Sequence, residues 1–582
     1  MALLDSLQTA SAVSIAACLL IYALYRWALP RPIAGIPYNS RAVRSPFGDI
    51  PSMLADMAKT GKSPLVWMLE QLEQLDAPLV QVFIHPFSRP RLLLADFREG
   101  QDILMRRKDF DRSEIMGDLF SGLVPEHHIH RPTNATWKSN RRILQDLMSP
   151  KFLHDVAGPV IHRNASNLVR LWQRKSSIAG NRPFNASEDI YYAALDAVLA
   201  FSFGEQFSHS AVMPNVDLLG SLSEETVSNL QESASVDEPV TFPEAKQDDA
   251  IAATLDLATA VEELQGSAMP RWKWWFMENF TAVGQKVQIK SGYIDDELRK
   301  AVARKDEQAG SEVSSAVDLM IRRETILAKK DGRAPNYLSR TMRDEAFGFV
   351  VAGHDTTSTT VLWALKYLAD TSRVQAHLRE AMQLAFATAK AEKRNPSISE
   401  ITSTTVPYLD ASMEEILRCS GTVPAVDRMA VTDTELLGHP IPKGTVVVIL
   451  GQGPSMRSRA FDIDEKRRSK SCQDVKTQGK HKTWDADDIA EFKPERWLIP
   501  SSEKQESSEF DAMAGPQLAF GLGSRGCFGK RLAYIELRIL LSLIVWNFHL
   551  IRCPDELSSY AQKAGITHKP YQCYVRLQPV EL

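Results

Sequence analysis

The pattern of apolar and polar positions along the chain is mainly that of α-helices. Apolar residues recur at helical spacing through most of the 582 residues, and the longest such pattern runs from about Leu338 to Leu368. Strand-like runs are short and few, such as residues 79 to 85 and 445 to 450. The sequence therefore predicts a mainly α fold with a small β region.

A long apolar stretch stands near the start of the chain. From Leu7 to Leu29 it is interrupted only near its ends, by Gln8 and Arg26, and it is long enough to span a bilayer as a helix. A cleaved signal peptide is the alternative, but no small-residue cleavage site follows and the N-terminal flank holds Asp5 instead of lysines. We therefore predict a single N-terminal transmembrane helix. Arginines follow this stretch and nothing basic precedes it, which favours a cytoplasmic location for the rest of the chain.

The rest of the chain reads as one connector and one large domain. Residues 30 to 37 hold three prolines and a glycine, which indicates a stiff connector. No Gly/Ser-rich linker and no internal repeat follows it. The predicted parts are a membrane anchor over residues 1–29, a proline-rich hinge over 30–37 and a single domain over 38–582.

Two polar stretches, residues 231–249 and 463–488, lack apolar periodicity and are predicted to be surface loops or insertions. The second contains the basic run KRRSK, which we interpret as part of a solvated loop in preference to a localisation or partner patch. The formal net charge of -4 gives no reason to expect nucleic acid as a partner.

One short turn near the C-terminus is unusual in its chemistry. Residues 520 to 530, FGLGSRGCFGK, place Cys527 among four glycines and beside basic side chains, and an apolar helical pattern begins directly afterwards. Backbone N–H groups, cations and a helix N-terminus all favour a negative sulfur. The turn alone leaves three readings open for Cys527: a nucleophile, a metal ligand or a buried structural cysteine.

The same turn resembles the haem-binding loop of the cytochromes P450, whose pattern is F-x-x-G-x-R-x-C-x-G. Phe520, Gly523, Arg525, Cys527 and Gly529 occupy its five fixed positions. The resemblance implies a cytochrome P450 fold over residues 38–582. It also implies a haem b cofactor with Cys527 as the axial thiolate ligand of its iron.

A second pair of motifs is similar to the family's structural elements. EILR places Glu415 and Arg418 one helical turn apart, where they can form an ion pair. FKPERW, residues 492 to 497, resembles the PERF-type segment, whose arginine is Arg496 here. The resemblance implies that Glu415, Arg418 and Arg496 form a triad that braces the cysteine loop.

Further residues are implied to contact the cofactor. WKSNRR matches W-x-x-x-R with Trp137 and Arg141, and both side chains are suited to donate hydrogen bonds to haem propionates. Arg428 and Arg525 occupy positions where the family has further propionate-binding bases.

The long helical pattern carries the segment AGHDTTSTT, residues 352 to 360, which resembles [AG]-G-x-[DE]-T-[TS]. The resemblance implies that Thr356 hydrogen-bonds the bound dioxygen and that Asp355 supplies a proton relay. A glycine and two threonines in mid-helix are locally unfavourable, which predicts a kinked helix with a hydroxyl turned into a cavity. We treat His354 as incidental, because the family leaves its position open.

Together these motifs identify the chain as resembling microsomal, filamentous-fungal members of the family. The implied function is the oxidation of a lipophilic small molecule with O2, in the biosynthesis of a terpenoid or polyketide. Because no flavin or nicotinamide fingerprint is found, electrons are expected from a separate NADPH–cytochrome P450 reductase, with cytochrome b5 as a further candidate partner. The expected location is the endoplasmic reticulum membrane. By analogy, an apolar pocket draws on residues near 113–130, 347–357, 422–427 and 564–567.

Two alternatives remain at this point. One is a haem-thiolate isomerase or dehydratase that needs no reductase, and the other is a non-catalytic haem-binding protein. Neither class needs the acid–threonine pair, so Asp355 and Thr356 favour the monooxygenase.

Overall fold

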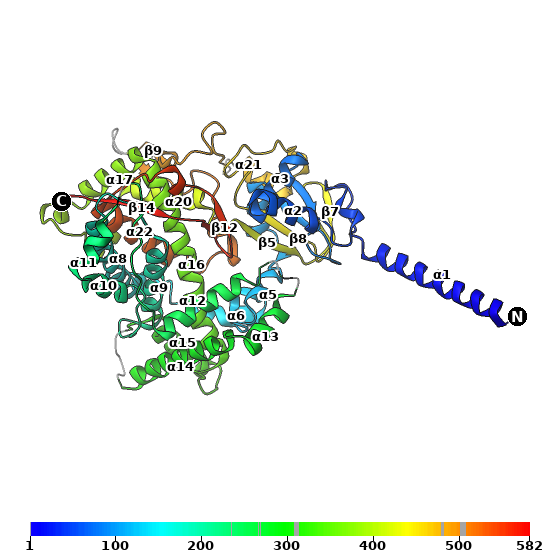
Figure 1. The fold of residues 1–582 in the computed structure, drawn as a ribbon, viewed down its shortest axis with the longest axis horizontal. Coiled ribbons are helices and arrows are strands. Elements are labelled where there is room, and N and C mark those ends of the chain that lie inside the picture. Colours follow the sequence, from blue (N-terminus) through cyan, green and yellow to red (C-terminus); the bar gives the residue numbers. More distant parts are fainter. Residues whose placement is uncertain are drawn as a thin grey trace. The chain divides into compact units, whose positions relative to one another are not determined.

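The computed structural model describes residues 2–233, 235–265, 267, 269–307, 313–478, 482–500 and 508–581. The chain divides into two compact units (Figure 1). Unit 1 comprises Met1–Asp111 and Ala425–His481, and unit 2 comprises Arg112–Pro424 and Lys482–Leu582. Both units draw on the range 38–582, and its description as a single catalytic domain stays a prediction.

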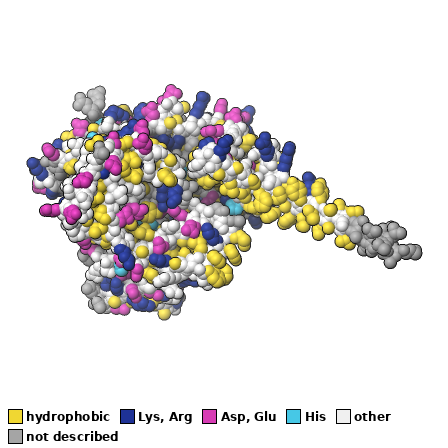
Figure 2. All heavy atoms as spheres, in the orientation of Figure 1, with side chains coloured by type: hydrophobic (Ala, Val, Ile, Leu, Met, Phe, Trp, Pro, Cys, Tyr) yellow, Lys and Arg dark blue, Asp and Glu magenta, His cyan; other side chains and the backbone are white. Residues whose placement is uncertain are grey.

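Unit 1 begins with the helix α1 (Ala2–Ala28). Large apolar side chains between Val13 and Trp27 are exposed along it, and Figure 2 shows them in yellow next to its grey end. This is the stretch predicted to be a transmembrane helix. Within the part of the chain that the structure describes, no helix is both long and apolar enough to cross a membrane.

The proline-rich segment after α1 is held in place by one side chain of unit 1. The Gln81 amide accepts a hydrogen bond from the Ile33 N–H at 2.8 Å and donates to the carbonyls of Ile33 and Ile36, each at 2.8 Å. Gln81 is fully buried. Because buried amides are costly to leave unpaired, these bonds fix the segment that the sequence predicts to be a hinge.

The body of unit 1 is a five-stranded sheet in the order β1-β2-β8-β5-β3. Strand β8 pairs parallel with β2, and the other neighbours are antiparallel. The runs predicted as strands form β1 and β8. The elements of unit 1 after α1 are α2 (Ile50–Thr60), α3 (Pro64–Gln74), β1 (Leu79–Val82), β2 (Arg91–Leu94), α4 (Phe97–Met105), β3 (Phe110–Asp111), β5 (Ala425–Ala430), β6 (Thr434–Leu436), β7 (His439–Ile441), β8 (Val446–Leu450) and α21 (Lys470–Thr477).

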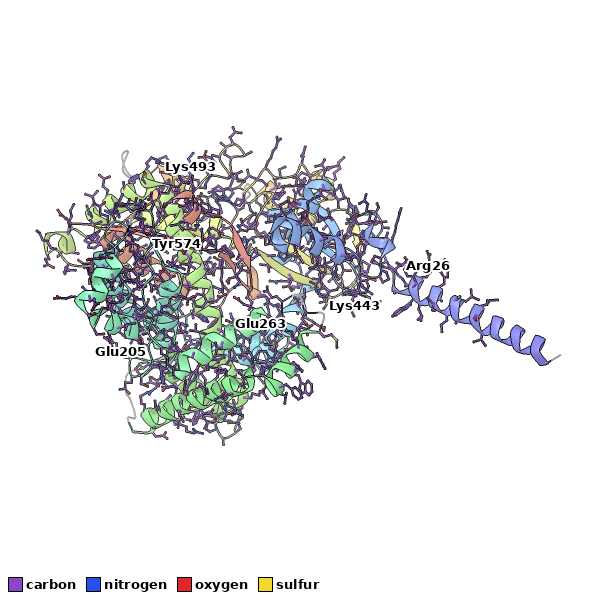
Figure 3. All side chains as sticks on the ribbon, viewed as in Figure 1. Arg26, Glu205, Glu263, Lys443, Lys493 and Tyr574 are labelled. Atoms are coloured by element: carbon purple, nitrogen blue, oxygen red, sulfur yellow. The ribbon has the colours of Figure 1, made fainter. Side chains whose placement is uncertain are left out.

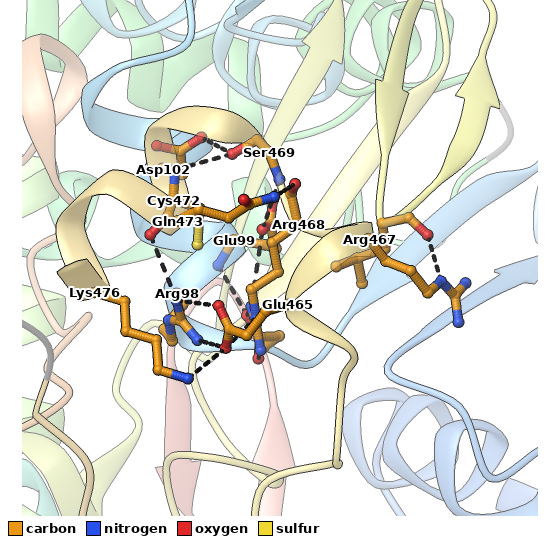
Figure 4. A network of polar contacts seen from close by, with 12 residues as sticks. Arg98, Glu99, Asp102, Glu465, Arg467, Arg468, Ser469, Cys472, Gln473 and Lys476 are labelled. Carbon is orange, nitrogen blue, oxygen red and sulfur yellow. Dashed lines mark hydrogen bonds and ion pairs between the residues drawn. The ribbon is translucent and has the colours of Figure 1, made fainter.

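The polar stretch 463–488 is more ordered than the predicted solvated loop. Its first part folds onto α4, where Arg468 donates to both carboxylate oxygens of Asp96 at 2.7 and 3.0 Å. Arg98 pairs with Glu465 in the same network (Figure 4), and Cys472 is buried. The prediction was wrong for Arg468 and Cys472, because Arg468 pairs with the buried Asp96 at the start of α4, which a periodicity argument cannot detect. The other basic residues of KRRSK are exposed, as predicted.

Unit 2 is mainly helical, with α16 running through it as one helix that packs along α9 (Figure 1). The predicted long helix is confirmed to within a few residues, and its start is capped by Ser339, whose hydroxyl accepts from the Met342 N–H at 3.3 Å. The described α-helices of unit 2 are α5 (Ile115–Phe120), α6 (Ala135–Leu144), α7 (Pro150–Phe152), α8 (Gly158–Ala179), α9 (Ser187–Phe203), α10 (Met213–Gly220), α11 (Glu224–Gln231), α12 (Asp249–Glu262), α13 (Pro270–Phe280), α14 (Val283–Glu307), α15 (Ala316–Lys330), α16 (Arg340–Asp370), α17 (Ser372–Ala385), α18 (Ala387–Ala391), α19 (Ile398–Ser403), α20 (Pro407–Ser420) and α22 (Lys530–Asn547).

The described strands of unit 2 form small sheets, and all of them except β4 come from its C-terminal part. The described strands are β4 (Phe184–Asn185), β9 (Leu498–Pro500), β10 (Ser508–Phe510), β11 (Phe548–Ile551), β12 (Gln562–Ala564), β13 (His568–Pro570) and β14 (Tyr574–Pro579). They make a three-stranded sheet β11-β14-β4 and two hairpins. Tyr574, labelled in Figure 3, begins the central strand β14.

The other polar stretch, residues 231–249, is also less loop-like than predicted. Val240 and Phe242 are buried, and Phe242 packs edge-on against Phe184 of β4. The prediction of a surface insertion is therefore wrong at these two residues, because two apolar side chains are too few to show a period in the sequence.

Candidate functional site

The cysteine turn is a tight loop closed by its own backbone. The Cys527 N–H donates to the Phe520 carbonyl at 2.8 Å. Gly521 and Gly523 have φ values of 60° and 71°, a conformation that side chains other than glycine rarely adopt. The loop leads directly into α22 at Lys530, as the apolar pattern predicts.

Two opposing effects act on the pKa of the Cys527 thiol. Cys527 is exposed at the surface of the loop, but protein atoms surround its sulfur on most sides. Burial raises the pKa of this thiol, while the backbone N–H of Gly529 and the charges of Arg141 and Lys530 lower it. Burial has the larger effect, so the pKa of the thiol lies above its ordinary value. A metal ion coordinated by the sulfur would favour the thiolate, since coordination deprotonates a thiol.

Helix α6 brings its two predicted residues to the cysteine loop. The Arg141 guanidinium lies 4.3 Å from the ring centre of Phe528 and 5.7 Å from that of Trp137. The Arg525 guanidinium lies 4.7 Å from the Trp137 ring. The structure therefore brings Trp137 and Arg141 of α6 to Arg525 and the cysteine loop, although α6 and the loop are far apart in the sequence.

Glu415 is the centre of a buried ion-pair cluster on α20. Arg418 donates to both of its carboxylate oxygens at 2.7 and 2.8 Å, and Arg496 donates to Oε1 at 3.0 Å. The Trp497 indole and the backbone N–H of Lys493, a residue labelled in Figure 3, complete its shell at 2.9 Å each. Burial alone would raise the pKa of Glu415, but the hydrogen bonds and charge of Arg418 lower it.

The contacts from α20 to the cysteine loop run through a residue that the motif analysis missed. Glu414 accepts from the Gln517 amide at 3.1 Å and from the hydroxyl of Tyr534, whose ring packs on Phe520. The triad itself bonds to residues 488–497. The one feature of the sequence that could have pointed to Glu414 is its position directly before the glutamate of E-x-x-R.

The middle of α16 has one face that is less buried than the rest. Ala352 is exposed and Phe349, Gly353 and Thr356 are partly exposed, whereas the residues around them are buried. A Cβ at Gly353 would lie 2.7 Å from Val198 of α9, so close helix packing accounts for this glycine. The Thr356 hydroxyl donates to the Ala352 carbonyl at 2.8 Å. The ring of Phe349 lies 5.8 Å from that of Phe528, which brings this face to the cysteine loop.

Asp355 lies next to Thr356 in sequence but is buried in a polar network of its own. Oδ1 is 2.8 Å from the Lys569 ammonium and also accepts from the Tyr191 hydroxyl. Oδ2 accepts from the Thr567 hydroxyl at 2.7 Å. Burial alone would raise the pKa of Asp355, but the charge of Lys569 lowers it and keeps the carboxylate ionised.

The chain as a whole has clear relatives among known proteins. Residues 101–462 and 482–575 match the family described as Cytochrome P450. The chain is 43% identical over 578 residues to the cytochrome P450 monooxygenase TRI13 of Fusarium sporotrichioides, covering 97% of this chain and 98% of that protein. It is 37% identical over 560 residues to the monooxygenase xilC of Penicillium crustosum, covering 96% and 94%. A third relative, GME11363 of Pestalotiopsis microspora, is 35% identical over 586 residues, covering 98% of each chain.

The chain belongs to the cytochrome P450 family. It is a cytochrome P450 monooxygenase with a haem-thiolate cofactor.

The donor set in unit 2 fits the haem of a cytochrome P450. A Cβ at Gly529 would lie 4.0 Å from the Cys527 sulfur, so this glycine leaves the space beside the sulfur open. Two guanidinium groups and an indole N–H are suited to bind propionates. Cys527 would ligate the iron, and Trp137, Arg141 and Arg525 would hold the ring. These individual roles stay predictions, as do those of Phe520, Gly523 and the Glu415–Arg418–Arg496 triad.

Arg428 belongs to unit 1 and not to the unit that carries Cys527. It lies on β5, is buried, and donates to the Asp427 carbonyl at 2.7 Å. Its role as a propionate ligand stays a prediction.

A second cluster of possible ligands, His127, His128 and Glu345, is better explained without a metal. Glu345 Oε2 lies 3.2 Å from His127 Nε2 and 2.7 Å from His128 Nδ1. His127 Nδ1 accepts from the Ile129 N–H at 3.2 Å, so the proton of the neutral ring is on Nε2, where a metal would bind. Burial lowers the pKa of both histidines to about 3. We therefore describe this cluster as a hydrogen-bonded contact between the 125–131 loop and α16.

The predicted pocket segment 347–357 lies on α16, and parts of the other three segments pack against that helix within unit 2. A Cβ at Gly348 would lie 2.2 Å from His127 Nε2, which places the 113–130 segment against α16. The hydroxyls of Thr360 and Thr422 are 2.8 Å apart, and those of Thr359 and Thr567 are 3.0 Å apart. The segments come together because the C-terminal hairpin and residue 422 both pack on α16.

Proposed function

We propose that this cytochrome P450 oxidises a lipophilic small molecule of fungal specialised metabolism, of the terpenoid or polyketide type. One observation carries the proposal: the less buried face of α16, with Phe349, Ala352 and Thr356, combines apolar surface with a single hydroxyl. Such a surface suits an apolar ligand that needs little polar recognition. The relatives named above are fungal monooxygenases. A further relative from Dothistroma septosporum, 39% identical over 310 residues, is described as a monooxygenase of the Hps1-dma1 cluster.

The residues of the chain have distinct parts in the proposed reaction. Haem ligated by a thiolate supplies the activation of O2 when it is bound. Thr356 offers a hydroxyl on the face of α16 that is next to the cysteine loop, and its present bond to Ala352 can be exchanged for one to a ligand. Asp355 holds an ionised carboxylate one residue away and takes part by moving protons.

The test of this proposal is a screen of lipophilic compounds for haem spectral shifts, followed by turnover with 18O2. The expected result is binding of terpenoid or polyketide compounds and one labelled oxygen atom in the product. Binding confined to small polar or charged compounds would contradict the proposed substrate class.

We propose further that electrons come from an NADPH–cytochrome P450 reductase, with cytochrome b5 as an additional donor. The support is the family match over residues 101–462 and 482–575, since cytochromes P450 typically take their electrons from a separate reductase. Purified protein should oxidise NADPH only after the reductase is added. Turnover with NADPH alone would contradict this proposal.

Attachment to the endoplasmic reticulum membrane, with the catalytic part in the cytoplasm, is a separate proposal. It is supported by the exposed apolar side chains of α1 and by those of α13, where Trp272, Trp275 and Phe280 are exposed. Cell fractionation followed by a carbonate wash tests it. The protein should stay with the membranes, and a variant without residues 1–29 should be released. Full release of the intact chain by carbonate would contradict a spanning anchor.

A further inference from the structure

The hairpin β12–β13 carries a lysine that no motif of the sequence marks. Lys569 is partly buried and stands on β13, between α12, α9 and α16. Its ammonium lies 2.8 Å from Asp355 Oδ1 on α16 and 2.6 Å from Glu262 Oε1 on α12. It is also 2.9 Å from the Tyr191 hydroxyl on α9. One side chain therefore joins three helices at the acid next to Thr356.

The geometry around this lysine is held by several independent contacts. Thr567 bonds to both Asp355 and Thr359 of α16, and the Trp363 indole donates to the His568 carbonyl at 2.7 Å. A Cβ at Gly565 would lie 3.2 Å from Glu262 Oε1, so the turn of the hairpin also approaches α12 closely. These contacts fix the backbone of the hairpin on both sides of Lys569.

Among the residues that the structure describes, Lys569 is the one permanently charged cation that faces Asp355. The groups that face Asp355 are Lys569, the Tyr191 hydroxyl and His354, while Glu262 faces Lys569. Tyr191 is neutral, because burial and Asp355 both raise its pKa. Burial lowers the pKa of His354, so that ring is neutral as well. The charge balance at Asp355 therefore depends on one residue of the hairpin.

We propose that Lys569 is a positioning residue for proton delivery, which keeps the Asp355 carboxylate ionised and fixed beside Thr356 so that it can take up and pass on protons. Lys569 touches neither substrate nor cofactor in this proposal and acts through Asp355. Without it, Asp355 would be buried with hydroxyl partners alone, which favours the neutral acid. A neutral acid cannot accept the next proton, so proton supply would slow at neutral pH.

The test compares Lys569→Met with Lys569→Arg, and with Lys563→Met as the matched control. Lys563 lies directly opposite Lys569 in the hairpin and is exposed. The readout is peroxide released per O2 consumed, with reductase and no added substrate. Reduction of O2 to water takes up more protons than reduction to peroxide, so slow proton supply raises the peroxide share. Photochemical reduction can replace the reductase, so a failure of the reductase proposal does not affect this test.

Lys569→Met should raise the peroxide share several-fold and move the acid limb of the pH profile to higher pH, since Asp355 loses its counter-ion. Lys569→Arg should restore both, and Lys563→Met should match the wild type. In the Asp355→Asn background, Lys569→Met should have no further effect, because a residue that acts through Asp355 cannot act in its absence.

The opposite results overturn the proposal. An unchanged peroxide share and pH profile in Lys569→Met, or an equal effect of that change in the Asp355→Asn background, would show that Lys569 does not act through Asp355. If Lys569→Met does not load haem, Lys569→Gln keeps a polar group of similar length and takes its place in the same comparison.

Discussion

Two buried carboxylates of unit 2, Glu415 and Asp355, are each surrounded by several hydrogen-bond donors. These donors come from different parts of the chain. Glu415 receives its donors from its own helix and from the short segment 493–497. Asp355 receives its donors from α9, from the C-terminal hairpin and from the residue that precedes β13. Both have a pKa below the ordinary range of a carboxyl, with a cation as the main opposing influence to burial.

The two sites differ in how deeply their charged side chains are buried. Arg418 and Glu415 have no exposed side-chain surface, so their pairing is part of the folded core. Lys569 and Asp355 keep some exposure, at 17% and 11% of their side-chain surface. We expect the first cluster to control the stability of the folded core of unit 2, and the second to control proton transfer in the folded protein.

The largest expected effect comes from breaking the first cluster. Arg418→Met leaves Glu415 buried with one guanidinium fewer, which costs about 3–5 kcal/mol for a broken buried pair. The variant should lose thermal stability and haem content together, as measured by thermal unfolding and absorbance. Arg373→Met is the control, because that exposed arginine pairs with Glu495 at the surface and should cost under about 1 kcal/mol. Normal stability in Arg418→Met would remove the distinction between the two sites.

Asp355→Asn should affect turnover and not folding. The amide keeps the shape of the side chain but cannot carry a proton, so product formation should fall by about 10²-fold while haem content is kept. Product per NADPH oxidised is the measurement. Asp370→Asn, at the end of the same helix, should leave this ratio unchanged. A collapse of haem content in Asp355→Asn would mean that this network is structural, like that of Glu415.

Thr356→Ala removes the hydroxyl next to Asp355 and tests whether it takes part in proton transfer. Loss of one hydrogen bond of about 1 kcal/mol predicts a roughly five- to tenfold change in the partition between product and peroxide. Electron use should continue and peroxide release should rise. Unchanged coupling would show that Thr356 does not position dioxygen or protons.

A third buried carboxyl, that of Glu536 on α22, should make the stability of the folded chain depend on pH. It accepts one bond from Thr357 at 3.1 Å, and burial raises its pKa to about 8. The folded chain therefore binds this proton more tightly than the unfolded chain. Its contribution to stability is full below the ordinary pKa of 4.5 and is lost as the pH rises towards about 8.

Glu536→Gln should remove this dependence. Its melting temperature should exceed that of the wild type by a few degrees near pH 8, and the difference should shrink or reverse near pH 5. A difference that does not change with pH would contradict the raised pKa.

The comparison also shows which parts of the site a sequence can reveal. Glu415, Arg418 and Arg496 lie in short motifs whose spacing already places them together, and the 31 residues of α16 follow from their apolar period. Lys569, Tyr191 and Glu414 were missed, because their contacts depend on how the hairpin, α9 and α22 pack on α16 and α20. The predictions for the two polar stretches were partly wrong for the same reason, because Arg468 and Phe242 have partners that are far away in the sequence.

The central claim is that the cysteine loop presents Cys527 as the thiolate ligand of haem. The most direct measurement is the spectrum of the reduced protein with carbon monoxide, for the wild type and for Cys527→His. The wild type should show the Soret band at the long wavelength that thiolate ligation produces, and Cys527→His should show it at the shorter wavelength of imidazole ligation. The short-wavelength band in intact, folded wild-type protein would contradict the claim.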